Sequence, residues 1–183
     1  AIYNQDAETA TLWVGEPAVK GLAGALIMSM TRAYLRANLL AGNEVPEAID
    51  DANTALYRDL AQGMYCSIMA VQFHPESGHA TLVSAGHQVP AVRYSFETKE
   101  LRTLQPNGIA LGFDSGPIFR NSLENMQIKL DNGDALFLFS PLAAKCKGVS
   151  GEELGNKGVY ALAKIAIEQG LAAMHEKLLK FLG

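Results

Sequence analysis

The residue best placed for chemistry is a single carboxylate, Glu16, in a tight turn that contains glycine and proline. The turn follows a short apolar segment, Thr11–Val14, and leads into a long apolar segment that starts at Gly21. A junction of strand, turn and helix can hold a charged group rigidly at the end of a sheet. The turn that carries Glu16 is therefore where chemistry is expected.

Other reactive side chains lie in ordinary contexts. Asp50 and Asp51 form an acidic pair, but their place in a helical pattern indicates a solvated helix face. Cys66 and Cys146 have no CxxC partner, which indicates small hydrophobic side chains in a reducing compartment rather than a zinc site or a disulfide. Histidine side chains in general change charge near neutral pH, so His87 invites a catalytic interpretation. The sequence contains no nucleophile elbow and no glycine-rich phosphate loop.

Hydrophobic patterns predict the elements that position these residues. Gly21 to Leu40 consists of helix formers with almost no polar face, which predicts a helix buried between layers. An amphipathic helix is expected over 44–61, and more helix over 150–182, which Gly170 kinks or divides. Period-two alternation predicts a meander of antiparallel strands, and a later apolar run predicts a central, buried strand. The expected strands are 2–3, 11–14, 65–73, 80–85, 89–96, 101–104, 123–130 and 135–139, with a hairpin turn at Asn4-Gln5-Asp6.

Composition and charge restrict the class of protein. With 183 residues, of which 49% are hydrophobic and 19% charged, the chain suits one globular domain rather than a disordered or fibrous protein. A net charge of -4, without a basic stripe interleaved with aromatic residues, argues against nucleic acid as a partner. Arg32 and Arg36 interrupt the longest apolar run, so we do not expect it to span or bind a membrane.

Four segments match a known set of motifs in order and spacing. The turn at Glu16, with Lys20 and Gly21, matches Asp-Val-Ser-Gly-Lys-Gly-Leu-Pro-Ala-Ala-Leu-Leu-Met, with Glu16 in place of Asp. In the other three segments, residues 84–87 match the motif Asn-Ala-Gly-His and residues 108–112 match the motif Pro-Leu-Gly. Residues 130–140 match a strand that begins with the motif Leu-x-x-Gly-Asp. Together they resemble the metal-dependent protein phosphatase (PPM) superfamily, in its bacterial stage II sporulation protein E (SpoIIE) branch. The resemblance implies an α/β sandwich of two antiparallel β-sheets packed face to face, with helices on both sides.

The resemblance also implies a metal site, and here the motifs are degenerate. The family hydrolyses phosphoserine or phosphothreonine with a water that bridges two Mn²⁺ or Mg²⁺ ions, which requires several converging carboxylates. Glu16 is one methylene longer than the family's bridging Asp, and Pro17 offers only its backbone carbonyl. Ser140-Pro141-Leu142 replaces the family's Thr-Asp-Gly, and proline has no carboxylate. The family's first and last aspartates would fall before residue 1 and after residue 183. Asp114 or Glu152 would serve instead only if the alignment shifts by a residue or two.

The other matched residues are expected to be structural. They are Gly21, Gly86, His87, Gly133 and Asp134. In the resemblance, the imidazole of His87 satisfies backbone groups where Gly86 breaks the strand. The metal candidates are therefore Glu16 and the carbonyl of Pro17, and no catalytic residue is identified.

These observations predict a pseudophosphatase, a phosphatase-like regulatory domain of bacterial signalling that binds a protein partner and needs no cofactor. Residues 1–183 would form one domain, truncated at both ends, of a longer cytoplasmic protein. The alternative is an active protein serine/threonine phosphatase that uses two Mn²⁺ or Mg²⁺ ions and acts on a regulatory phosphoprotein. A third hypothesis is a homodimer formed through uncovered sheet edges or helices.

Overall fold

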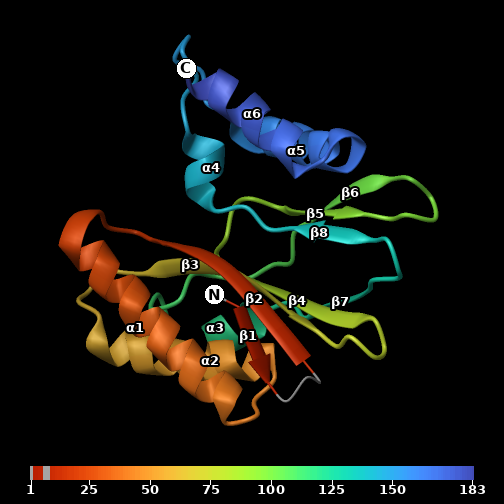
Figure 1. Ribbon diagram of the computed structural model, residues 1–183. Coiled ribbons are helices and arrows are strands. Elements are labelled where there is room, and N and C mark those ends of the chain that lie inside the picture. Colours follow the sequence, from red (N-terminus) through yellow and green to blue (C-terminus); the bar gives the residue numbers. More distant parts are fainter. Residues whose placement is uncertain (1, 6–8) are drawn as a thin grey trace. The chain divides into compact units, whose positions relative to one another are not determined.

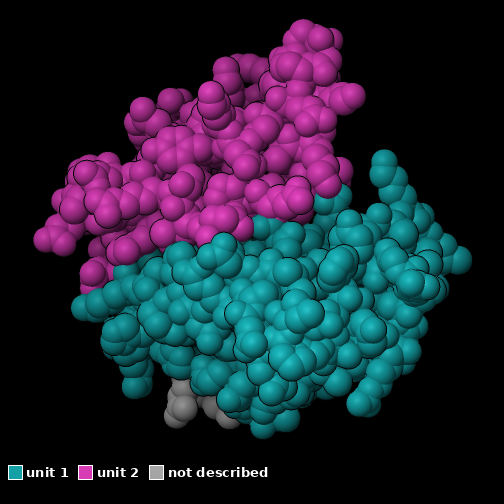
Figure 2. Space-filling view, turned by 180° about the vertical axis from the view of Figure 1, so that it is seen from behind, with its two compact units in different colours: residues 1–87, 106–130 teal, residues 88–105, 131–183 magenta. Residues whose placement is uncertain are grey.

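The computed structural model describes the backbone of residues 2–5 and 9–183, and side chains from residue 9 onward. The chain divides into two compact units (Figure 2). The first unit contains residues 1–87 and 106–130, and the second contains residues 88–105 and 131–183. Each unit has one antiparallel sheet with helices beside it, as the sequence predicted.

The first unit is built on a five-stranded antiparallel sheet with the strand order β1-β2-β3-β4-β7. Its strands are β1 (Ile2–Gln5), β2 (Thr9–Pro17), β3 (Cys66–Phe73), β4 (His79–Ala85) and β7 (Met126–Lys129). Successive residues along β3 are buried, so this strand is covered on both faces, which confirms the prediction made from its apolar alternation.

Two long helices lie side by side against this sheet, α1 (Gly21–Leu40) and α2 (Val45–Asp59) (Figure 1). A short helix, α3 (Pro117–Ser122), belongs to the same unit. Helix α2 is amphipathic, as predicted, and begins with proline in its first turn. The core between the helices and the sheet consists of apolar side chains that are almost fully buried: Trp13, Ile27, Leu35, Leu39, Ile49, Leu56, Ile68 and Val83.

The predicted environment of helix α1 is wrong, although its bounds are correct. We expected a helix buried between layers, but the buried residues form a stripe spaced three or four apart, which is typical of a surface helix. Leu22 is 77% exposed and Leu26 is 56% exposed. The apolar pattern predicted burial wrongly because alanine, glycine and leucine occupy the solvent-exposed face of helix α1, where other surface helices carry charged residues.

The second unit is built on a three-stranded antiparallel sheet with the strand order β6-β5-β8. Its strands are β5 (Ala91–Tyr94), β6 (Leu101–Leu104) and β8 (Ala135–Phe137). Its helices are α4 (Pro141–Lys145), α5 (Gly155–Gln169) and α6 (Leu171–Leu182). Gly170 separates α5 from α6 with a φ of 92°, so it divides the helical region, which is one of the two outcomes predicted.

Three strand predictions need correction. The expected central strand, β8, lies at an edge of its sheet, and its residues are only partly buried. The expected single meander is split, because β3 and β4 belong to one sheet and β5 and β6 to the other. The expected hairpin of the first two strands is present, but Asn4 and Gln5 lie within β1, and Asp6 lies outside the described residues. None of the helices in the described residues is long and apolar enough to cross a membrane.

Candidate functional site

The two metal-ligand candidates lie at the end of strand β2. In the ladder with β3, Glu16 faces Ser67 and Pro17 faces Cys66, so both belong to the sheet rather than to a free loop. The Ser67 hydroxyl donates a hydrogen bond to the carbonyl oxygen of Glu16 at 3.3 Å. Both candidates are half-buried. The sheet therefore fixes the backbone that carries the Glu16 carboxylate, while a metal-binding role for either residue stays a prediction.

Cys66 is a nucleophilic side chain beside these candidates. Burial raises the pKa of the Cys66 thiol to about 11, and the negative charge of Glu16 adds to the rise, while a hydrogen bond with Thr31 opposes it. The Cys66 sulfur lies 3.4 Å from the sulfur of Met28 within the core. Because a thiol with this pKa is almost wholly protonated near pH 7, Cys66 is unsuited to act as a nucleophile.

Gly86 and His87 follow strand β4 in a tightly packed segment. Gly86 has a φ of +71°, and a Cβ at this position would lie 2.7 Å from the backbone nitrogen of Ala110. Its N–H donates to the carbonyl oxygen of Gly108 at 3.0 Å. His87 is only 2% exposed, and its own carbonyl oxygen accepts a hydrogen bond from the Ser84 hydroxyl at 3.4 Å. Both residues therefore lie where packing restricts them, and solvent has little access to the imidazole.

Asp134 organises the turn that precedes strand β8. Its carboxylate accepts hydrogen bonds from the N–H of Phe96 at 2.8 Å, from Arg93 at 3.0 Å and from the N–H of Asp131 at 3.3 Å. The Asp134 side chain is 3% exposed. Desolvation opposes ionisation of this carboxyl, but the hydrogen bonds outweigh it and hold the pKa of Asp134 below its usual value. Gly133 has a φ of +92°, and a Cβ at this position would lie 2.8 Å from Cγ of Phe96.

Pro141, which stands where the resemblance places a catalytic aspartate, begins helix α4. Ser140 is the N-cap residue, and Pro141 occupies the first turn, where its missing N–H leaves no helical hydrogen bond unmade. The proline ring is buried. This position therefore serves the start of a helix and supplies no side-chain oxygen.

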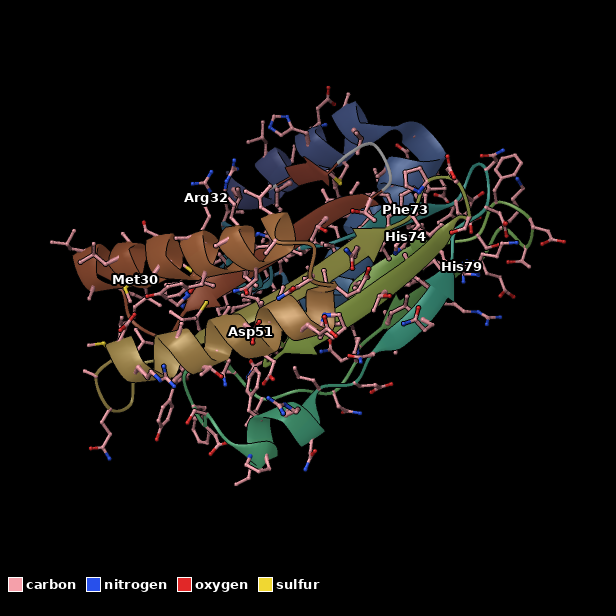
Figure 3. All side chains as sticks on the ribbon, turned by 90° about the horizontal axis from the view of Figure 1, so that it is seen from below. Met30, Arg32, Asp51, Phe73, His74 and His79 are labelled. Atoms are coloured by element: carbon pink, nitrogen blue, oxygen red, sulfur yellow. The ribbon has the colours of Figure 1, made fainter. Side chains whose placement is uncertain are left out.

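A metal centre requires several donors in one place. Among residues 9–183, whose side chains are described, no group of three or more His, Cys, Asp and Glu side chains could hold a metal ion. Figure 3 places Asp51 on helix α2, and His74 and His79 at the turn between β3 and β4. Asp50, expected to face water, instead forms an ion pair with Arg120 at 2.6 Å. The described donors do not fit the dinuclear centre that the resemblance implies.

The two acids considered as substitute ligands are both engaged elsewhere. The carboxylate of Asp114 accepts hydrogen bonds from the N–H groups of Gly116 at 2.9 Å and Phe119 at 3.1 Å, at the start of helix α3. The carboxylate of Glu152 accepts a hydrogen bond from the Ser150 hydroxyl, which lowers the pKa of Glu152. Both carboxylates therefore stabilise local turns.

Sequence reasoning missed one arrangement of charged residues in the second unit. Arg93 on β5 and Arg102 on β6 face each other directly in the strand ladder. The hairpin between these strands was predicted, but the pairing depends on its register, which a shift of one residue would change. The turn Glu97-Thr98-Lys99-Glu100 contained the only signal that could have fixed this register.

The chain matches a known family model over almost its whole length. The model described as "Stage II sporulation protein E (SpoIIE)" matches residues 7–182. No curated protein matches the chain by sequence.

Solved structures of phosphatase domains have the same fold. The SiaA-PP2C domain of Pseudomonas aeruginosa superposes with a TM-score of 0.81 at 17% identity, covering 100% of this chain and 73% of that one. The PP2C phosphatase domain of SpoIIE from Bacillus subtilis, with a fragment of its regulatory domain, superposes with a TM-score of 0.78 at 14% identity. The match covers 99% of this chain and 52% of that one. The RsbU and RsbW domains of Rv1364c from Mycobacterium tuberculosis superpose with a TM-score of 0.72 at 20% identity. The match covers 96% of this chain and 47% of that one. This chain therefore spans about half the length of the last two chains.

Proposed function

Because the chain belongs to the stage II sporulation protein E family, we propose that it is a pseudophosphatase, a regulatory domain of bacterial signalling that acts by binding a protein partner. The observation that carries the proposal is Pro141, buried in the first turn of helix α4, where the family pattern requires an aspartate. The proposed location is the cytoplasm, and the proposed context is a longer signalling protein.

The chemical argument concerns the number of oxygen donors. Hydrolysis of a phosphate monoester by the family mechanism requires carboxylates that converge on two divalent cations and on the water between them. One carboxylate, Glu16, cannot hold two cations, and its extra methylene moves the oxygens relative to those of an aspartate. Proline cannot supply the second carboxylate. A chain with this donor set is therefore expected to bind Mn²⁺ weakly and to leave phosphate esters intact.

The same argument leaves the fold available for binding. Function resides in sites carried by a fold, so a phosphatase fold without its metal ligands can still present a shaped surface to a protein. One structural relative contains RsbU and RsbW domains in a single chain, and another contains a phosphatase domain with part of a regulatory domain. These arrangements support a regulatory setting for this chain. Homodimer formation stays a prediction.

The test combines metal binding with catalysis. The full-length natural protein is titrated with Mn²⁺ by calorimetry, and hydrolysis of p-nitrophenyl phosphate is measured at saturating Mn²⁺. We expect no stoichiometric binding and no turnover above buffer, with no change for Glu16→Ala. Glu76→Ala, which removes an exposed carboxylate from a turn, is the matched control.

Binding of two ions together with turnover that Glu16→Ala abolishes and Glu76→Ala preserves would overturn the proposal. That result would establish the alternative, an active manganese- or magnesium-dependent protein serine/threonine phosphatase with a rearranged ligand set.

A further inference from the structure

The hairpin of β5 and β6 brings two like charges together. Arg93 and Arg102 are directly opposed in the antiparallel ladder, so their side chains leave the same face of the sheet (Figure 1 shows the two strands). Like charges in directly opposed positions destabilise a hairpin. Such a pair needs an anionic partner between or beside the two guanidinium groups.

The carboxylates near this pair satisfy it only in part. Arg93 donates one N–H to Asp134 at 3.0 Å, but its Nε is buried and has no hydrogen-bond partner among the described residues. Arg102 is bound to Glu100 at 2.7 Å, with both side chains more than half exposed. A buried donor without an acceptor is rare, so the existing carboxylates leave part of the hydrogen-bonding capacity of Arg93 unused. An exposed ion pair is worth little, so an incoming anion can replace Glu100 at small cost.

A cavity of about 200 Å³ lies at this position. The residues that line it are Arg93, Ser95, Thr98, Glu100 and Arg102. The lining therefore combines two guanidinium groups, two hydroxyls and one displaceable carboxylate. The Thr98 hydroxyl makes no hydrogen bond to any described residue, so it is free to donate to a ligand. The volume admits a tetrahedral oxyanion.

We propose that this cavity binds a phosphate group. Guanidinium groups present planar forks of N–H donors that match the oxygens of phosphate, and two of them approach the double negative charge of a phosphate at neutral pH. The hydroxyls of Ser95 and Thr98 supply further donors from the turn. The phosphate group comes from free inorganic phosphate or from a phosphoserine side chain. This site does not depend on the proposed function, because none of its residues belongs to the matched metal motif.

The experiment follows the arginine side chains directly. Uniformly ¹⁵N-labelled protein is titrated with inorganic phosphate and, separately, with a short phosphoserine peptide, its unphosphorylated form serving as control. The Nε–Hε resonances of Arg93 and Arg102 are recorded at constant ionic strength. We expect both resonances to shift in a saturable manner with at least one phosphate source, and the source with the lower Kd identifies the ligand.

Variants separate a built site from general attraction between charges. Arg102→Gln removes an exposed side chain that packing does not need, and is expected to weaken phosphate binding about tenfold, because a hydrogen bond to a charged group is lost. Thr98→Val is expected to weaken it about threefold. Arg58→Gln, which removes an exposed charge from helix α2, is the matched control and is expected to leave binding unchanged.

Two results would overturn the proposal. One is a shift that stays linear up to high phosphate concentration for both sources. The other is equal weakening by Arg102→Gln and Arg58→Gln, which would assign the effect to net charge alone. Neither result bears on metal binding or turnover, so the proposed function is tested separately.

Discussion

Asp134 is expected to be the residue of the second unit whose charge contributes most to stability. Its carboxylate is 3% exposed and holds the N–H of Phe96, the N–H of Asp131 and the side chain of Arg93. A hydrogen bond to a charged group contributes about 1.5 to 3 kcal/mol. The Arg93 side chain is 29% exposed and both N–H groups lie in turns, so water recovers part of this loss. We therefore expect Asp134→Ala to lower the free energy of unfolding by about 3 kcal/mol.

Asp134→Asn is the gentler version of this change. The amide keeps one oxygen acceptor but loses the charge and the interaction with Arg93, so we expect a loss of about 1.5 kcal/mol. Urea unfolding followed by circular dichroism measures both variants, because the single tryptophan lies in the first unit. Glu97→Gln, which removes an exposed carboxylate from the same hairpin, is the control. Losses below about 0.5 kcal/mol for both Asp134 variants would refute the reasoning, since exposed substitutions have effects of that size.

The pH dependence gives an independent check on the same carboxyl. Hydrogen bonds hold the pKa of Asp134 below its value of 3.8 in a free side chain. The unfolded chain therefore binds this proton more readily than the folded chain, and acid favours unfolding. The stabilisation is complete above about pH 4 and is lost as the pH falls through the lowered pKa. Identical acid unfolding of the wild type and Asp134→Asn would contradict this assignment.

Three further predictions concern the first unit and the metal question. Gly86→Ala is expected to lower the free energy of unfolding, measured in urea, by about 3 kcal/mol, and Gly21→Ala by about 1 kcal/mol. Both glycines have a positive φ, but only Gly86 lies against backbone atoms. Equal losses for the two variants would contradict this prediction. Cys66, with a pKa of about 11, is expected to react with a disulfide reagent at pH 7.5 only after unfolding, measured in Cys146→Ser. Addition of a chelator is expected to leave the urea midpoint unchanged, and a lower midpoint would show that a bound ion stabilises the fold.

The parts of the fold that could be predicted are those with long, regular patterns. The bounds of helix α1 and the buried strand β3 followed from residue types alone. Helices α3 and α4 were missed, because five or six residues are too few to show a helical period. The edge position of β8 was also missed. The continuous apolar run of β8 suggested a strand covered on both faces, but its residues are only partly buried, and residue types alone do not say whether both edges carry a hydrogen-bonded neighbour.

The candidate sites show the same difference between local and long-range information. The junction of strand and helix near Glu16 could be predicted from neighbouring residues, but the predicted turn at Glu16 was wrong, because strand β2 continues through Pro17 and pairs with β3. The pairing of Arg93 with Arg102 could not be predicted, because it depends on strand register. The hydrogen bond from Arg93 to Asp134 joins segments about forty positions apart in the chain. A local sequence pattern therefore could not predict it.

Pro141 connects the stability of the fold with the proposed loss of catalysis. A carboxylate in this buried position would need a cation or strong hydrogen bonds, because an isolated buried charge is very unfavourable. Proline removes that requirement, and its fixed φ suits the first turn of helix α4. Under the proposed function, Pro141 therefore gives helix α4 a start that is stable without a metal ion.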